Sequence, residues 1–410
     1  MSAEASTPAE PRRVPFSLFQ GDLLNRGFGV IGLGGYRPLP VALRCLALVG
    51  ATWVPMAVLA AVQGLVSAQV EARNFFADYA AYGQFLIAVP LFVVAERTVA
   101  LNTREAARSF VSSGVIGPED AARLGPVHGR LRRWRLARGP EIVTISLAFV
   151  LSFFTIGPEM LGVGPAVTWH SGAGTPAICT LPGGLTFAGA WLMFVALPIL
   201  NYTWLRLAWK VVIWTDYLYQ MSRFRLRLVA SHPDLTGGLG FVSEVQAKWA
   251  LVIFAYGISN VAAVIAYKVG IEGASVFLMP VWAPAVLFVL IAPALFTLPL
   301  LMFTKPLSRA KRRALAAYRE HARRHAADVD SRWLDTRVTG TPPLTDVADL
   351  NNVAVMYNRT RQMRVVPFDL RSFGQLVGST VGSIATALPI VRFEATLEDW
   401  LDLIARLLGR

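Results

Sequence analysis

The sequence predicts an all-α polytopic membrane protein with about six transmembrane helices and long helices that extend into the cytoplasm. The chain has 410 residues, of which 54% are hydrophobic and only 16% are charged, whereas soluble domains carry about 25% charged residues. Its long apolar runs carry charges mainly at their ends. The net charge is +13 and there are 2 cysteines. Together these features argue against an acidic soluble enzyme, a disordered chain and a disulfide scaffold.

Six runs are long enough to cross a bilayer, because a transmembrane helix needs about 20 apolar residues. The expected spans form a membrane domain over residues 40–304 and are 40–66, 79–97, 142–163, 185–205, 249–268 and 276–303. The preceding segment, 1–39, is polar and Pro-rich at its start and has no apolar core of the signal-peptide kind. We expect it to be a cytoplasmic N-terminal segment.

Lysine and arginine alternate between the two sets of loops. The segment 101–140, the segment after the fourth span and the start of the tail at Lys305 are rich in these bases. The other loops hold only Arg73. Basic loops stay in the cytoplasm, so both termini are predicted to be cytoplasmic.

The tail, 305–410, is expected to be cytoplasmic and helical, but one part of it is ambiguous. Residues 372–391 carry no charge and are rich in Gly, Ser and Thr. We expect an apolar hairpin that packs on the protein without crossing, and a seventh span is the alternative. The final stretch, 397–408, has the apolar spacing of an amphipathic helix.

The string HPDLTGGLGF, residues 232–241, is the most distinctive motif and lies between the fourth and fifth spans. Its candidate residues are His232, Asp234, Gly237, Gly238 and Gly240. Glycines permit backbone conformations that other residues resist, which indicates a rigid helix-to-helix turn. The alternative is a polar site where His232 and Asp234 bind a ligand or an ion.

The Trp and Arg pattern of residues 204–227, the HPDLTGGLGF string and the later string MRVVPFD, residues 363–369, together resemble an uncharacterised group of bacterial multipass inner-membrane proteins. The resemblance implies a location in the bacterial inner (plasma) membrane. It implies no activity and assigns no catalytic residue.

Polar and helix-breaking residues inside the spans are the candidate pore residues. Gln84 and Asn260 are the deepest polar side chains, Glu159 lies at the outer end of the third span, and Pro293 lies inside the sixth. Polar side chains at such positions usually bond neighbouring helices. The proline predicts a kink, and kinked helices are tolerated where they line a cavity.

Bases beside the spans are the candidate lipid contacts. Arg206 and Lys210 lie among tryptophans at the inner end of the fourth span, and Arg132 and Arg133 precede the third. We expect them to extend to anionic headgroups on the cytoplasmic side. Because these runs adjoin membrane spans, we do not expect them to bind nucleic acid.

The sequence contains no recognisable catalytic motif: no Walker loop, GxSxG elbow, HExxH or CxxC pair is present. His321 and His325 share one helix face, but Arg323 and Arg324 between them disfavour a metal ion. No metal and no cofactor are therefore expected.

Three functions fit these features. The first is a channel or permease that works as a homo-oligomer and passes ions or small solutes, favoured by the kinked spans and the basic inner side. The second is a membrane-embedded scaffold or regulator whose cytoplasmic helices bind a partner. The third, an enzyme acting on lipids, depends on the His232–Asp234 loop alone and is the least favoured.

Overall fold

The computed structural model describes residues 23–30, 32–33, 37–67, 75–121, 123–160, 169–170, 180–181, 184–264, 279–334 and 344–386. Within these ranges the chain is helical and forms no β-strand. Two isolated β-bridges join Ile116 to Leu226 and Thr180 to Thr186. The predicted all-α class is therefore confirmed.

Among the described residues, six helices are long and apolar enough to cross a membrane, and each overlaps one predicted span. They are Leu39–Gly64, Tyr79–Ser112, Leu124–Gly157, Phe187–Ser222, Gly240–Val261 and Trp282–Asp328. Several exceed the length that lipid requires, since 34 residues rise about 50 Å and the hydrocarbon core is about 30 Å thick. The chain is thus a multipass membrane protein whose helices continue beyond the bilayer.

The spans are assembled from shorter helical elements. The elements of the first three spans, with the short helix that precedes them, are α1 (Leu23–Val30), α2 (Pro38–Ser67), η1 (Phe75–Ala77), α3 (Tyr79–Ala81), η2 (Tyr82–Ala88), α4 (Val89–Ser112), α5 (Pro118–Ala121), α6 (Leu124–Leu136) and α7 (Arg138–Met160). Those of the last three spans and the tail are α8 (Phe187–Trp191), η4 (Leu192–Ala196), α9 (Leu197–Ser222), α10 (Gly240–Lys248), α11 (Ala250–Tyr256), η5 (Gly257–Ala262), α13 (Met279–Thr297), η6 (Leu298–Phe303), α14 (Thr304–Leu334), α15 (Leu344–Gln362) and α16 (Leu370–Ala385).

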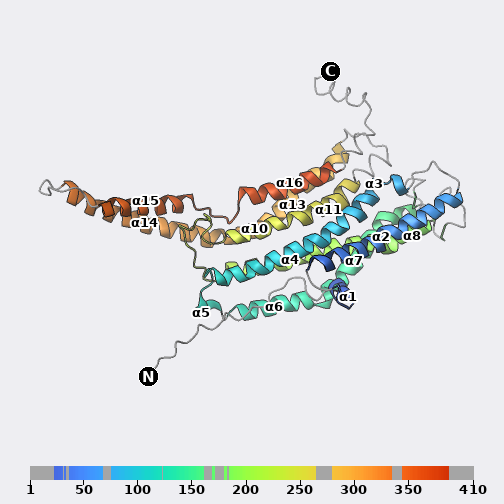
Figure 1. Ribbon diagram of the computed structural model, residues 1–410, viewed down its shortest axis with the longest axis horizontal. Coiled ribbons are helices and arrows are strands. Elements are labelled where there is room, and N and C mark those ends of the chain that lie inside the picture. Colours follow the sequence, from blue (N-terminus) through green and yellow to red (C-terminus); the bar gives the residue numbers. More distant parts are fainter. Residues whose placement is uncertain are drawn as a thin grey trace, which may run out of the picture.

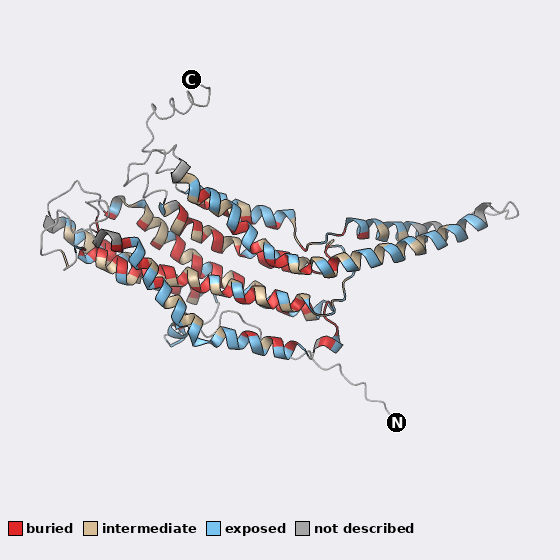
Figure 2. Ribbon diagram, turned by 180° about the vertical axis from the view of Figure 1, so that it is seen from behind, coloured by how far each residue is buried: buried red, intermediate tan, exposed pale blue. Residues whose placement is uncertain are grey.

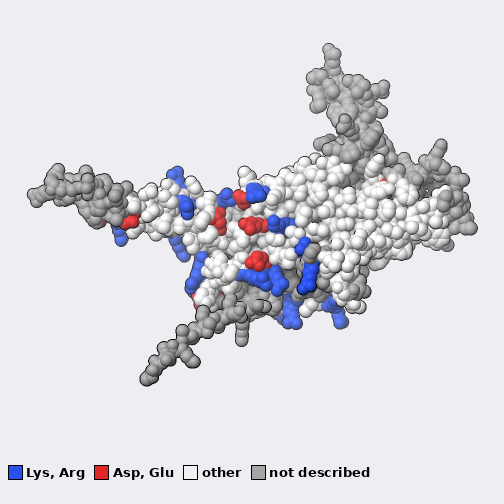
Figure 3. All heavy atoms as spheres, in the orientation of Figure 1, with Lys and Arg blue, Asp and Glu red and all other residues white. Residues whose placement is uncertain are grey.

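The helices lie side by side along the long axis of the molecule, and α14 and α15 form a hairpin that projects from one end (Figure 1). On the face shown in Figure 3, Lys and Arg lie over the side that carries this hairpin and over the middle of the molecule, whereas the described surface toward the opposite end shows almost none. We call the first region the basic end, where α4 and α9 terminate, and the second the apolar end, where α3 and α8 begin.

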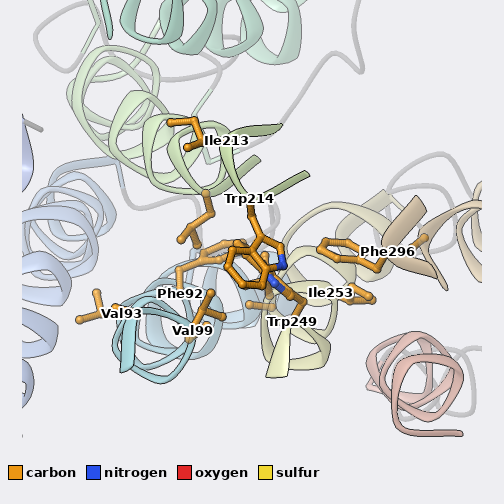
Figure 4. Packing of buried hydrophobic residues seen from close by; sticks show 14 of the residues in the cluster. Phe92, Val93, Val99, Ile213, Trp214, Trp249, Ile253 and Phe296 are labelled. Carbon is orange, nitrogen blue, oxygen red and sulfur yellow. The ribbon is translucent and has the colours of Figure 1, made fainter. Parts of the chain in front are cut away.

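The core of the bundle is apolar and closely packed. Trp214 and Trp249 are fully buried and lie among Phe92, Ile253 and Phe296 (Figure 4). Buried residues face the inside of the bundle and exposed ones cover its outside (Figure 2). Many exposed side chains are large and apolar, as lipid contact requires.

The ambiguous segment 372–391 is described up to residue 386, and over that range it is the single helix α16. This helix packs lengthwise on α10, α11, η5 and α13. Its first turn meets α10 through the Ser243–Ser372 hydroxyl pair at 3.1 Å, and Ser383 lies against Gly257 of η5. The described part is thus a member of the bundle, and residues 387–410, including the expected amphipathic helix, lie outside the described residues.

Candidate functional site

Charged side chains meet inside the bundle where α2, α4 and α9 approach each other. Arg44, Glu96, Arg206 and Lys210 are only 1–3% exposed. The first three of these and Asn25 of α1 form what we call the buried charge network, and Lys210 lies one turn beyond Arg206 on α9.

Both carboxylate oxygens of Glu96 accept hydrogen bonds. Oε2 accepts from Nη2 of Arg206 at 2.5 Å, and Oε1 accepts from Nδ2 of Asn25 at 2.8 Å. The amide oxygen of Asn25 accepts in turn from Arg44 Nη1 at 3.2 Å, and Arg44 Nε donates to the carbonyl of Leu33 at 2.7 Å. The network therefore connects α1, α2, α4 and α9 through one carboxylate.

The outward faces of the same helix turns are apolar. Leu43 and Leu46 flank Arg44 on α2 and are 39% and 68% exposed, and Val94 next to Glu96 on α4 is 39% exposed. Lipid-facing side chains therefore surround charges that point into the bundle. This is the usual arrangement of ionisable residues within a membrane, where they mark ion or substrate paths by default.

The inward position of Arg206 and Lys210 differs from the headgroup contacts that we expected for them. Residues 206, 210, 213 and 217 all fall on the buried face of α9, spaced by three or four residues. This helical spacing was the sequence signal that the two bases are buried. The nearby tryptophans favoured a membrane-surface position instead. The partner of Arg206, Glu96, lies 110 residues away in the sequence, so no local pattern indicated the ion pair.

Arg132 and Arg133, the other two candidate lipid contacts, do lie on the surface. Both are exposed on α6, where the neighbouring Trp134 stacks on Trp209 of α9 with ring centroids 5.8 Å apart.

The structure brings Gln84 to the segment that contains Asn260. Gln84 Nε2 donates to the carbonyl of Ser259 at 3.0 Å, while Asn260 Nδ2 donates to the Ser259 hydroxyl at 2.7 Å. Both lie in π-helical segments, η2 and η5. The contact is therefore a hydrogen bond between two irregular spans. Segments of this kind interrupt the regular α-helical hydrogen bonding and are frequent at functional sites.

The other two candidate pore residues give less information. Pro293 is buried inside α13, which also contains Pro284 and passes into the 3₁₀ segment η6. Glu159 belongs to α7, but its side chain lies outside the described residues.

The carboxylate of Asp234 accepts hydrogen bonds from the backbone of its own loop. It accepts from the backbone N–H groups of Thr236 at 2.8 Å, Gly238 at 3.0 Å and Gly240 at 2.9 Å. Nδ1 of His232 lies 2.8 Å from the same carboxylate. Burial raises the pKa of Asp234, but the backbone hydrogen bonds outweigh it and the net pKa is lowered.

The loop conformation requires its glycines. Gly237 and Gly238 have φ of 68° and 94°, values that favour glycine, and Leu235 has φ of 56°. A Cβ at Gly237 would lie 3.0 Å from Met363 Cε, and the Leu235 carbonyl accepts from the N–H of Arg364 at 2.7 Å. The strings 232–241 and 363–369 therefore lie against each other, and we call this contact the loop junction.

The remaining candidates form no metal site in the part of the chain that the structure describes. The rings of His321 and His325 stack with centroids 6.2 Å apart. Among the described residues, His, Cys, Asp and Glu form no group of three or more that could hold a metal ion.

Comparisons of the chain with protein-family models, curated proteins and solved structures find no match. Its activity must therefore be inferred from the buried charge network and from the arrangement of the helices.

Proposed function

We propose that the protein is a channel or permease for ions or small solutes that works as a homo-oligomer in a bacterial inner membrane. The buried charge network carries this proposal. Placing charged groups inside a lipid-embedded bundle is costly, and such groups usually serve ion or substrate passage. In this proposal a permeating ion competes with Glu96 or Arg206 for its partner.

Irregular helices support the proposal by providing places where the spans can bend. In the part of the chain that the structure describes, three spans contain π-helical segments, η2, η4 and η5, and the last span contains prolines and the 3₁₀ segment η6. Broken or irregular helices are tolerated in membranes where neighbouring helices or a cavity satisfy the backbone.

The basic end is proposed to face the cytoplasm, following the rule that Lys- and Arg-rich loops stay inside. This places the N-terminus and the α14–α15 hairpin in the cytoplasm. For the C-terminus, α16 favours the alternative of a seventh crossing. The helix runs from Ser243 near the basic end to Gly257 farther along the fifth span.

Flux through reconstituted liposomes tests the transport proposal. We expect wild-type protein to pass K⁺, Cl⁻ or H⁺ faster than empty liposomes, and Glu96→Gln to change that rate at least about tenfold, the effect of about 1.4 kcal/mol on a barrier. Glu105→Gln is the matched control, because Glu105 is an exposed residue of the same helix. Rates equal to those of empty liposomes for all three ions and for a panel of small solutes would contradict the proposal.

A second candidate function, a scaffold, rests on the α14–α15 hairpin. The hairpin projects from the basic end (Figure 1), and Val355 and Met356 of α15 are 43% and 45% exposed there. These two side chains are the exposed large apolar residues described on α15 and are the candidate contacts for a partner. In this case a defined protein would co-purify with the wild type and be lost from Val355→Asp/Met356→Asp, with ion flux unaffected.

A further inference from the structure

A groove and a pocket follow one another along the seam between α7 and α9. The groove has a volume of about 530 Å³ and is almost entirely apolar; α1 closes it on one side. Its lining includes Gly27, Ile145, Phe149, Phe194 and Tyr202. This volume lies within the range of about 300–1,000 Å³ that is usual for bound small molecules.

The pocket lies nearer the basic end, and charged side chains contribute to its lining. Its lining includes Arg135, Glu141, Trp209 and Lys210, and Tyr202 lines both the groove and the pocket. The Tyr202 hydroxyl lies 3.5 Å from the carboxylate of Glu141. The pocket encloses about 20 Å³, room for one water-sized group and no more.

Bases outnumber acids in the pocket lining, which contains Arg135, Arg206 and Lys210 but one acid, Glu141. Arg135 is half-buried at the end of α6, and Arg26, Arg132, Arg133 and Arg138 are exposed on α1, on α6 and at the start of α7. Figure 3 shows Lys and Arg side chains along this edge of the molecule. An apolar groove alone accepts any acyl chain, but these bases distinguish headgroups by charge.

We propose that the α7–α9 seam binds an anionic phospholipid. An acyl chain fills the groove, and the phosphate lies at the mouth of the pocket beside Arg135. One phosphate oxygen fits within the pocket, because its volume admits a single group of that size. The order of apolar groove, aromatic hydroxyl and basic pocket follows the order of chain, interface and headgroup in one leaflet. The pocket adjoins the buried charge network, because Arg206 also lines it, but lipid retention is measured without ion flux and tests the seam separately.

Native mass spectrometry of the full chain in detergent tests the proposal, with phosphatidylglycerol and phosphatidylcholine offered separately. We expect phosphatidylglycerol to be retained in preference. Arg135→Gln should lower its retention about five-fold, as an attraction of about 1 kcal/mol per base implies, and Arg135→Lys should restore most of it. The control is Arg313→Gln, which removes an exposed base of α14.

The groove is tested by filling it. Gly27→Phe places a ring at the groove, and a Cβ at Gly27 meets no atom within 4 Å, so the fold is expected to tolerate the change. Retention of both lipids should fall. Gly64→Phe is the matched control, because Gly64 is equally open but lies on α2 away from the groove.

Three outcomes would overturn the proposal. The first is equal retention of the two lipids by the wild type. The second is unchanged phosphatidylglycerol retention in both Arg135→Gln and Gly27→Phe. The third is displacement of the lipid by millimolar inorganic phosphate alone, which would show that the pocket binds a free anion without the groove.

Discussion

At the scale of single residues, Glu96 is the carboxylate that connects the buried charge network. It accepts hydrogen bonds from Arg206 and from Asn25, and Arg44 joins the network through Asn25. Both arginines are at most 3% exposed. A buried carboxylate with several donors is costly to remove because the partner charge remains in the protein interior.

We therefore expect Glu96→Gln to destabilise the protein by about 3–5 kcal/mol, the usual cost of removing one partner of a buried ion pair. Thermal unfolding in detergent measures the loss. Glu105→Gln should leave the unfolding temperature unchanged. Combining Glu96→Gln with Arg206→Gln should recover part of the loss, and a double variant that is as unstable as the sum of the two single variants would show that the pair is not coupled.

Asp234 should make the loop junction sensitive to acid. Its pKa in the folded protein lies below the ordinary value of 3.8, so its contribution to stability is complete above that value and is lost as the pH falls through the lower folded pKa. Asp234→Asn should cost about 1–3 kcal/mol at pH 7, the price of unsatisfied buried donors. The difference from wild type should shrink below pH 3.8; a constant difference from pH 7 to pH 3 would exclude this role.

Sequence reasoning at this scale succeeded where a residue acts on its neighbours and failed where its partner is distant. The turn at Asp234 follows from the proline and glycines beside it. The burial of Arg206 depends on Glu96 in another span, and no local sequence pattern around Arg206 predicts which residue its partner is.

At the scale of elements, the six spans were predictable because lipid imposes both length and composition on a helix. The position of α16 was not predictable in this way. Its 16 residues are fewer than a span requires, and it carries small polar residues that suit either a hairpin or a packed helix. Only its contacts with α11, η5 and α13 place it in the bundle.

Close approach at Gly257 allows α16 to pack on η5. A Cβ there would lie 2.6 Å from Ser383 Cβ and 2.9 Å from Phe288 Cε1. Gly257→Val should therefore separate the helices and lower stability by about 1–3 kcal/mol, as overpacking does. Gly378→Ala is the control, since its Cβ meets no atom within 4 Å and alanine favours the helix. Thermal unfolding that gives equal stability for both variants would contradict this packing.

At the scale of the whole molecule, the asymmetry of charge along the long axis fixes the proposed orientation. The net charge is +13, and on the face that Figure 3 shows the described Lys and Arg lie over the middle of the molecule and the side from which α14 and α15 project. The sequence predicted this asymmetry, because the count of bases in each loop needs no knowledge of packing.

The proposed seventh crossing predicts the side of the membrane on which the C-terminus lies. With Cys45 and Cys179 replaced by serine, we expect Arg410→Cys in intact cells to react with a membrane-impermeant maleimide, as a seventh crossing requires. Arg225→Cys, on the loop after α9, should react only after lysis. Protection of both positions in intact cells would place the C-terminus in the cytoplasm, as the sequence first suggested.

The last span and the hairpin share one continuous helix, from Trp282 to Asp328. Only the 3₁₀ segment η6, whose Pro299, Leu300 and Phe303 are buried, separates the part among the other spans from α14. A tilt of the span that keeps η6 packed therefore turns α14 with it. The 31 residues of α14 extend about 46 Å at 1.5 Å per residue, and a tilt of about 5° in the membrane would move the far end by about 4 Å. The hairpin is therefore a mechanical lever: it magnifies small motions of the span, and a load on its tip is transmitted back to the bundle.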